Sequence, residues 1–158
     1  QRTFSLGGKK KHIVAVAIDG SLNCEKALDW YCDVIHHQEF FVVLLHCPEL
    51  ADVAKSGGMV FSPAVWHDMW QKEKGKIAAL KLRYEKKLQD RQIDCKWLTL
   101  NTSGKPGEAL VKASAEYKAS LMVMGTRGQS TVQRTIMGSV SDYVVHHSKS
   151  PVLVYKNL

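Results

Sequence analysis

Residues 119–141 read ASLMVMGTRGQSTVQRTIMGSVS, and this stretch decides the fold of the chain. It opens with a short apolar run, which is typical of a buried parallel strand. Glycines follow at Gly125 and Gly128, and Gly138 then precedes a serine-rich segment suited to the start of a helix. Glycine lets the backbone approach an anion closely, and serine hydroxyls and amides at a helix start can donate to it. The stretch therefore predicts a strand, a phosphate-binding loop and a helix that act as one unit.

Two commoner nucleotide motifs are missing from the sequence. No Gly-Lys pair is followed by Ser or Thr, so a Walker site is absent. The G-x-G-x-x-G fingerprint is also absent, which argues against a nicotinamide-binding Rossmann enzyme.

Apolar strands and amphipathic helices alternate on either side of this stretch. We expect strands at 11–18, 40–46, 95–100, 120–124 and 152–155, and helices at 21–37, 63–91, 106–118 and 139–147. Such alternation predicts an α/β fold, with an open, five-stranded, mostly parallel sheet, helices on both faces and a Rossmann-like arrangement. Ligands bind such sheets at the carboxyl ends of the strands. A single site therefore requires the first and fourth strands to be neighbours.

Length and composition predict one domain. The chain has 158 residues, of which 45% are hydrophobic and 23% charged, and we expect a flexible tail at 1–10 and a nucleotide-binding domain at 11–158. No apolar stretch approaches the ~20 residues of a membrane span. The four cysteines have neither metal-ligand nor disulfide spacing, so we expect a cytoplasmic protein without a metal site or a membrane partner.

The net charge of +7 favours an anionic partner but does not choose among nucleotide, nucleic acid and membrane surface. Lys9, Lys10 and Lys11 form the tightest basic cluster, which we interpret as part of a solvated tail. Basic and aromatic residues are not interleaved as in sequence-reading proteins. A nucleic-acid-binding module is therefore the weakest of the alternatives.

The chain resembles the universal stress protein family over nearly its whole length. The resemblance runs from IVAVAIDGS at 13–21 through LLH at 44–46 to PVLV at 151–154. The family's ATP-binding signature, G-x2-G-x9-G-[ST], is matched by Gly125, Gly128, Gly138 and Ser139. The family contains nucleotide-binding members and members that lack these glycines, and this chain is similar to the former. The resemblance implies the adenine nucleotide alpha hydrolase-like form of the sheet.

The resemblance also implies which residues hold the nucleotide. The nucleoside would contact Ala17, Ile18, Asp19, the backbone of Cys47, Met124 and Gly125. The phosphates would contact Arg127, Gly128, Gly138, Ser139, Val140 and Ser141. Other interpretations remain open: Asp19 could serve as a turn or capping carboxylate, and Arg127 could face solvent. For Ser139 and Ser141, capping the helix and binding an anion are compatible, since both use the same helix end.

The function that follows is an ATP-binding, stress-response regulatory protein. We expect ATP, ADP or AMP as the ligand, with Mg²⁺ accompanying it, and a homodimer formed through Val152, Leu153, Val154 and Tyr155. The alternative is an enzyme on the same site, a slow ATPase or a nucleotidyl transferase. No general base or Walker acidic pair can be assigned, so we name no catalytic residue and expect at most weak hydrolysis.

Overall fold

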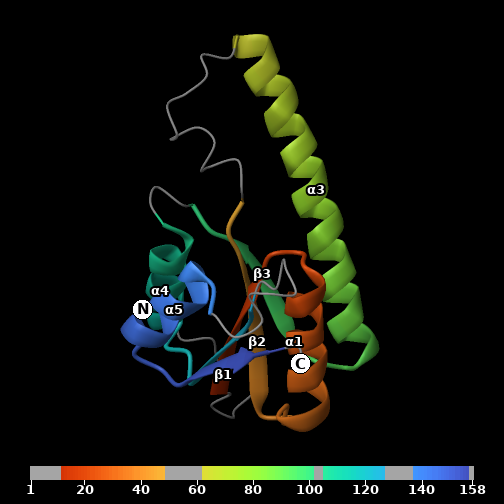
Figure 1. The fold of residues 1–158 in the computed structure, drawn as a ribbon. Helices are drawn as coiled ribbons and strands as arrows, with labels where there is room; N and C mark the ends of the chain where they lie inside the picture. The colour runs from red at the N-terminus through yellow and green to blue at the C-terminus, as the bar shows by residue number, and fades with distance from the viewer. Residues whose placement is uncertain (1–11, 49–61, 102–104, 127–136, 157–158) are drawn as a thin grey trace.

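A computed structural model describes residues 12–48, 62–101, 105–126 and 137–156. Five strands form one sheet in the order β3-β2-β1-β4-β5 (Figure 1). They are β1 His12–Ile18, β2 Phe40–His46, β3 Cys95–Thr99, β4 Leu121–Gly125 and β5 Val152–Tyr155. Neighbouring strands are parallel in every pairing, which confirms the α/β prediction. The chain builds outward from β1 to β3 and then crosses to the other side of β1, so the strand order reverses between β1 and β4.

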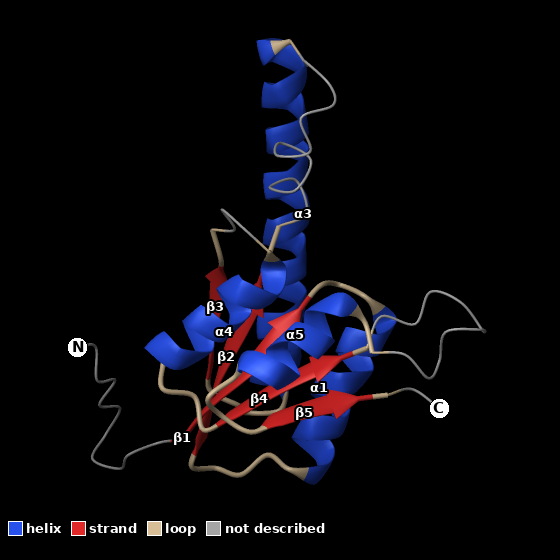
Figure 2. Ribbon diagram, turned by 60° about the vertical axis from the view of Figure 1, so that its left-hand side comes forward, coloured by secondary structure: helices blue, strands red, loops and turns tan. Residues whose placement is uncertain are grey.

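Helices cover both faces of the sheet (Figure 2). One face carries α1 (Leu22–Val34) and α3 (Pro63–Asp90), and the other carries α4 (Pro106–Glu116) and α5 (Ser139–His147). Each face has its own apolar core: Leu28 and Tyr84 belong to the first, and Leu110, Met122 and Val144 to the second. Burial on both sides explains why the central strands are apolar at successive positions.

Several predicted element ends are off by a few residues. Helix α1 ends at Val34 rather than at residue 37, and the Ile35 N–H completes its last turn by donating to Tyr31 O at 2.9 Å. Helix α4 ends at Glu116, since Lys118 has a φ of +51°, which no helix continues. The tail predicted at 1–10 lies outside the described residues.

Helix α3 has two unlike halves. Its C-terminal half is packed on the sheet, where Tyr84 and Leu88 are buried and Ile77 and Leu80 pack against the first core. Its N-terminal half projects past the sheet (Figure 1), and Trp70 there is 42% exposed. Although α3 is long, neither it nor any other helix in the described part of the chain combines the length and hydropathy needed to cross a bilayer.

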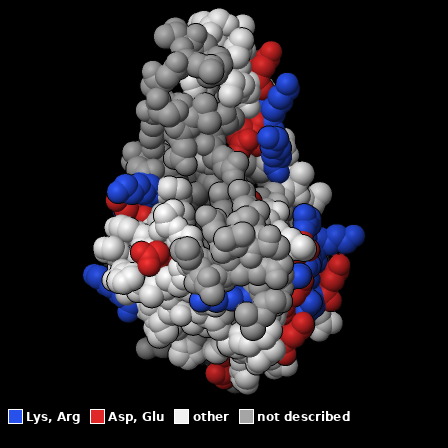
Figure 3. Space-filling model, in the orientation of Figure 1, with Lys and Arg blue, Asp and Glu red and all other residues white. Residues whose placement is uncertain are grey.

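An ion-pair ladder joins α1 to the packed half of α3. The α1 carboxylates belong to Glu25, Asp29 and Asp33, and the α3 cations to Arg83, Lys87 and Arg91. Both sets repeat every four residues, so they lie on facing helix surfaces. Lys87 Nζ is 2.8 Å from both Glu25 Oε1 and Asp29 Oδ2. Figure 3 shows the alternating charges where the two helices run side by side.

Candidate functional site

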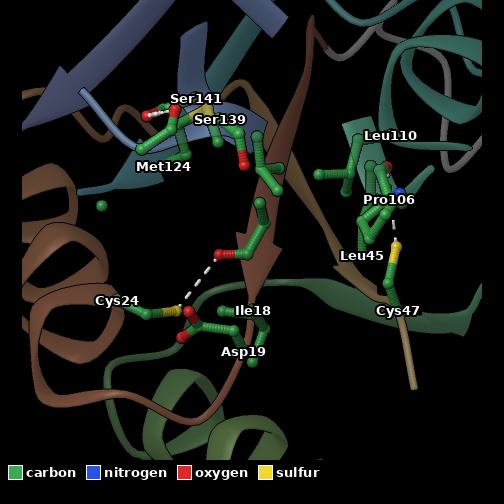
Figure 4. Close-up of a pocket in the computed structure, with 14 residues that line it drawn as sticks. Ile18, Asp19, Cys24, Leu45, Cys47, Pro106, Leu110, Met124, Ser139 and Ser141 are labelled. Atoms are coloured by element: carbon green, nitrogen blue, oxygen red, sulfur yellow. Dashed lines mark hydrogen bonds between the residues drawn. The ribbon is translucent and has the colours of Figure 1, made fainter. Parts of the chain in front are cut away.

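A cavity of about 580 Å³ lies at the carboxyl ends of β1, β2 and β4 (Figure 4). This size suits a nucleotide-sized ligand. All of the predicted site residues line it except Arg127 and Gly128, which lie outside the described residues. The lining also includes Cys24, Leu45, Pro106 and Leu110, which the sequence analysis did not select. The expected neighbourhood of β1 and β4 is confirmed, because β4 pairs directly with β1.

The turn after β1 presents Asp19 to the cavity. Gly20 has a φ of +79°, which side chains rarely tolerate. The Ser21 N–H donates to Asp19 Oδ1 at 2.9 Å, and Ser21 Oγ accepts from the Cys24 N–H at 3.2 Å. Asp19 is therefore a turn carboxylate, as the alternative interpretation expected, while Ser21 caps α1.

The Cys24 side chain is hydrogen-bonded to the end of β1, just before this turn. It is 3% exposed, and Sγ donates to Ala17 O at 3.1 Å. Burial raises the pKa of the Cys24 thiol to about 12, and the nearby Asp19 carboxylate adds to the rise. The thiol is therefore protonated at neutral pH. Cys24 shares one face of α1 with the buried Leu28 and Tyr31, a spacing that predicts burial, but no sequence signal placed it beside a cavity.

The end of β4 touches the first turn of α1. A Cβ on Gly125 would lie 2.8 Å from Asn23 O and 2.9 Å from Asn23 C. Backbone atoms cannot give way there as a flexible side chain would. From the sequence, the loop glycines are expected to allow the close approach of an anion. At Gly125 the structure supplies a second reason, the close packing of a strand end on a helix.

The N-terminus of α5 faces the cavity without a side-chain cap. Gly138, the N-cap, has the ordinary extended angles φ −64° and ψ 155°, and among the described residues a Cβ there would meet only Ser141 Oγ at 3.8 Å. The first helical bond runs from the Asp142 N–H to Gly138 O, so the N–H groups of the preceding turn have no helical acceptor. Such a helix end carries partial positive charge and suits an anion.

The two serines of this turn differ. Ser141 is 3% exposed, and its Oγ donates to Gly138 O at 2.9 Å. Ser139 is exposed. The hydroxyl at Ser139 is therefore the better placed of the two to meet a ligand, while Ser141 uses its hydroxyl within the helix.

Helix α4 forms the opposite wall. Its first residue, Pro106, and Leu110 one turn later both line the cavity. The helix packs tightly against α5, since a Cβ on Gly107 would lie 2.8 Å from the Tyr143 ring. Cys47 Sγ reaches Pro106 O at 3.9 Å and links the end of β2 to this wall. Pro106 and Leu110 share a helix face in the sequence, but only the packing of α4 on α5 directs that face to the cavity.

The cavity thus combines an apolar part with two kinds of polar group. Leu45, Leu110 and Met124 supply apolar walls. Asp19 offers a carboxylate, and the α5 N-terminus offers hydrogen-bond donors. Among the described residues, no group of three or more His, Cys, Asp or Glu side chains could hold a metal ion.

Comparison with known proteins gives consistent matches. The model of the Universal stress protein family matches residues 11–156. The universal stress protein YxiE of Bacillus subtilis is 32% identical over 143 residues, covering 89% of this chain and 96% of that protein. The universal stress protein Mb2028c of Mycobacterium bovis is 31% identical over 92% of this chain, which spans 48% of that protein.

A solved structure supports the same fold. The universal stress protein family protein At3g01520 of Arabidopsis thaliana, solved with AMP bound, superposes with a TM-score of 0.66 at 21% identity, and the match covers 93% of this chain and 92% of that chain. At this level of sequence identity, the similarity establishes that the two chains share a fold.

Proposed function

Because the chain belongs to the universal stress protein family, we propose that it is a cytoplasmic regulatory protein that binds ATP, ADP or AMP in the cavity at β1, β2 and β4. One observation carries the proposal: the uncapped N-terminus of α5 faces the same cavity as Asp19. A nucleotide carries groups complementary to both. Its phosphate can accept hydrogen bonds from the N–H groups at the N-terminus of α5, and its ribose hydroxyls can donate to the Asp19 carboxylate.

The cavity suggests an orientation for the nucleotide. The base would lie among Ala17, Leu45 and Leu110, near the backbone of Cys47, with the ribose toward Asp19. The phosphates would meet Ser139, Val140 and the N–H of Ser141, with Arg127 and Gly128 completing the loop. Mg²⁺ would accompany the phosphates as their counterion rather than occupy a protein cage. The relative from A. thaliana solved with AMP supports an adenine nucleotide.

We further propose a homodimer through β5. This strand is the edge of the sheet, and its residues Val152, Leu153, Val154 and Tyr155 are all partly exposed. An apolar edge invites pairing with another strand. The apolar area continues onto α1, where the centroid of the Trp30 ring lies 6.3 Å from that of the Tyr155 ring and Val34 is 62% exposed.

Substitution of Gly138 tests the site. The described part of the chain leaves room for a side chain at Gly138, so the Gly138→Val variant should fold, while the added methyl groups would compete with a phosphate. Calorimetry should show at least a tenfold loss of ATP affinity, about 1.4 kcal/mol. Gly75→Val is the matched control, because no described residue would come within 4 Å of a Cβ on Gly75 in α3. Unchanged ATP affinity in a folded Gly138→Val protein would exclude this site for the phosphates.

A further inference from the structure

The side chain of His46 holds the end of β1. His46 is the last residue of β2, and its partner in the sheet is Ile18, the last residue of β1. His46 Nδ1 lies 2.8 Å from Ile18 O. A carbonyl oxygen only accepts, so Nδ1 carries the proton and donates it to this bond. The His46 side chain is 6% exposed, so bulk water is not at hand to replace it as the donor.

Trp97 on β3 keeps the His46 ring in place. The two ring centroids are 5.5 Å apart, and the ring planes are inclined by 34°. The indole N–H of Trp97 donates to Thr99 Oγ1 at 2.9 Å, so it does not compete for the Ile18 carbonyl. Packing against the indole limits rotation of the imidazole, and the bond to Ile18 is therefore well defined.

The bond to Ile18 also orients Asp19. Ile18 O belongs to the peptide group that joins Ile18 to Asp19. Because a trans peptide is planar, holding its oxygen orients the whole group, including the Cα atom that carries the Asp19 side chain. The Ser21 N–H holds the carboxylate from the other end. Asp19 is thus fixed at its backbone by His46, although His46 is not one of the described residues that line the cavity.

The backbone of His46 is held in the same way. The Leu100 N–H, just after β3, donates to His46 O at 2.7 Å. This oxygen belongs to the peptide group that leads into Cys47, on the base side of the proposed site. The peptide groups that lead into Asp19 and Cys47 are therefore both hydrogen-bonded through His46, one by its ring and the other by its carbonyl.

We infer that His46 is a positioning residue that makes the site select ribonucleotides over nucleotides without ribose hydroxyls. It does so by holding the Asp19 carboxylate where the ribose hydroxyls can donate to it. This inference rests on the proposed function and deepens it, because it names the class of nucleotide that the site prefers.

Calorimetry with ATP and 2′,3′-dideoxy-ATP on matched variants tests this role. The wild type should prefer ATP by roughly tenfold or more, since hydrogen bonds to a charged group are strong. His46→Leu removes the donor and should weaken ATP binding by roughly tenfold while changing dideoxy-ATP affinity by less than about twofold. His46→Asn is the matched variant, because its side-chain nitrogen takes the place of Nδ1 and its branched outline resembles that of leucine. It should keep the preference for ATP.

The Asp19→Ala background shows whether His46 acts through Asp19. Asp19→Ala should itself abolish the preference for ATP over dideoxy-ATP. Adding His46→Leu should then change that preference by less than about twofold, because the two residues act in one chain of contacts. A further large change in the double variant would show that His46 acts by another route and would overturn the inference.

The ratio of the two affinities separates positioning from general support. If both nucleotides bind equally more weakly to His46→Leu, or if His46→Asn behaves as His46→Leu does, His46 merely stabilises the fold and the inference is wrong. A wild type that binds both nucleotides equally well would also overturn it, although nucleotide binding at this site would stand. A wild type that binds neither would refute the proposed function and the inference with it.

Discussion

The Cys24 thiol makes the stability of this protein sensitive to alkaline pH. An ordinary thiol ionises near the reference pKa of 9.0, whereas the folded protein keeps Cys24 protonated to about pH 12. Above pH 9 the unfolded chain therefore binds fewer protons than the native one. By linkage, the free energy of unfolding falls as the pH rises through this interval.

The Cys24→Ser variant isolates this effect, since a serine hydroxyl does not titrate there. The wild type should lose stability more steeply than the variant between pH 9 and 12, by up to about 1.4 kcal/mol per pH unit. Urea unfolding curves at a series of pH values measure both slopes. Below pH 9 the difference in the free energy of unfolding between the two proteins should not change with pH. Parallel slopes above that pH would show that the thiol ionises in the folded state as readily as in the unfolded one.

Gly125 and Gly138 belong to the same motif but should respond differently to alanine. At Gly125 the new Cβ collides with the α1 backbone, and we expect a cost of about 2 kcal/mol or more. At Gly138 the residues that the structure describes leave room for the Cβ, and the loss of a favourable N-cap residue should cost under about 1 kcal/mol. Urea denaturation of the two variants gives the comparison. Equal costs would mean that β4 can shift away from α1.

At the scale of elements, the ladder between α1 and α3 should contribute to stability through Lys87. This ammonium group is 24% exposed and pairs with two carboxylates. In Lys87→Met those carboxylates lose their shared cation, and we expect a loss of about 1 kcal/mol that shrinks in high salt. Lys86→Met, at the exposed neighbouring position, removes the same charge and serves as the control. Thermal unfolding at low and high salt tests the prediction, and an equal effect of both substitutions would contradict it.

The elements themselves were predictable where local chemistry specifies them. Ser21 and Ser62 cap the helices that follow them, and β1 and β2 are continuous apolar runs. The two halves of α3 were not distinguishable, because Trp70 and Tyr84 both fit a helical stripe although only Tyr84 lies over the sheet. Hydrophobic periodicity indicates which face of a helix is apolar, but it does not indicate whether another element packs against that face.

The site was predictable in the same partial way. Asp19 and the glycines near α5 could be selected from the sequence because their residue types suit a nucleotide site. The resemblance to the universal stress protein family then assigned a role to each of them. Leu110 could not. It lines the cavity through the packing of α4 on α5, two elements distant in sequence, and no local pattern records such a contact.

At the scale of the whole molecule, the proposed dimer has a direct test. Light scattering at tens of micromolar should report twice the 17.7 kDa of one chain. Tyr155→Glu should yield monomers, because each copy would bring a carboxylate to the apolar edge. A monomeric wild type, both with and without ATP, would rule out the β5 dimer. Retained ATP affinity in the Tyr155→Glu variant would show that nucleotide binding does not require assembly.

The central place of β1 in the sheet has a consequence for synthesis. Val14 pairs with Leu121 and Val16 with Val123, so β1 is synthesised more than a hundred residues before β4, its partner in the sheet. Contacts of such sequence separation slow folding. Until β4 emerges, one edge of β1 is unpaired in the nascent chain and open to aggregation. The nucleotide cavity needs β4 and α5, so under the proposed function ligand can stabilise only chains in which both of these elements have been made.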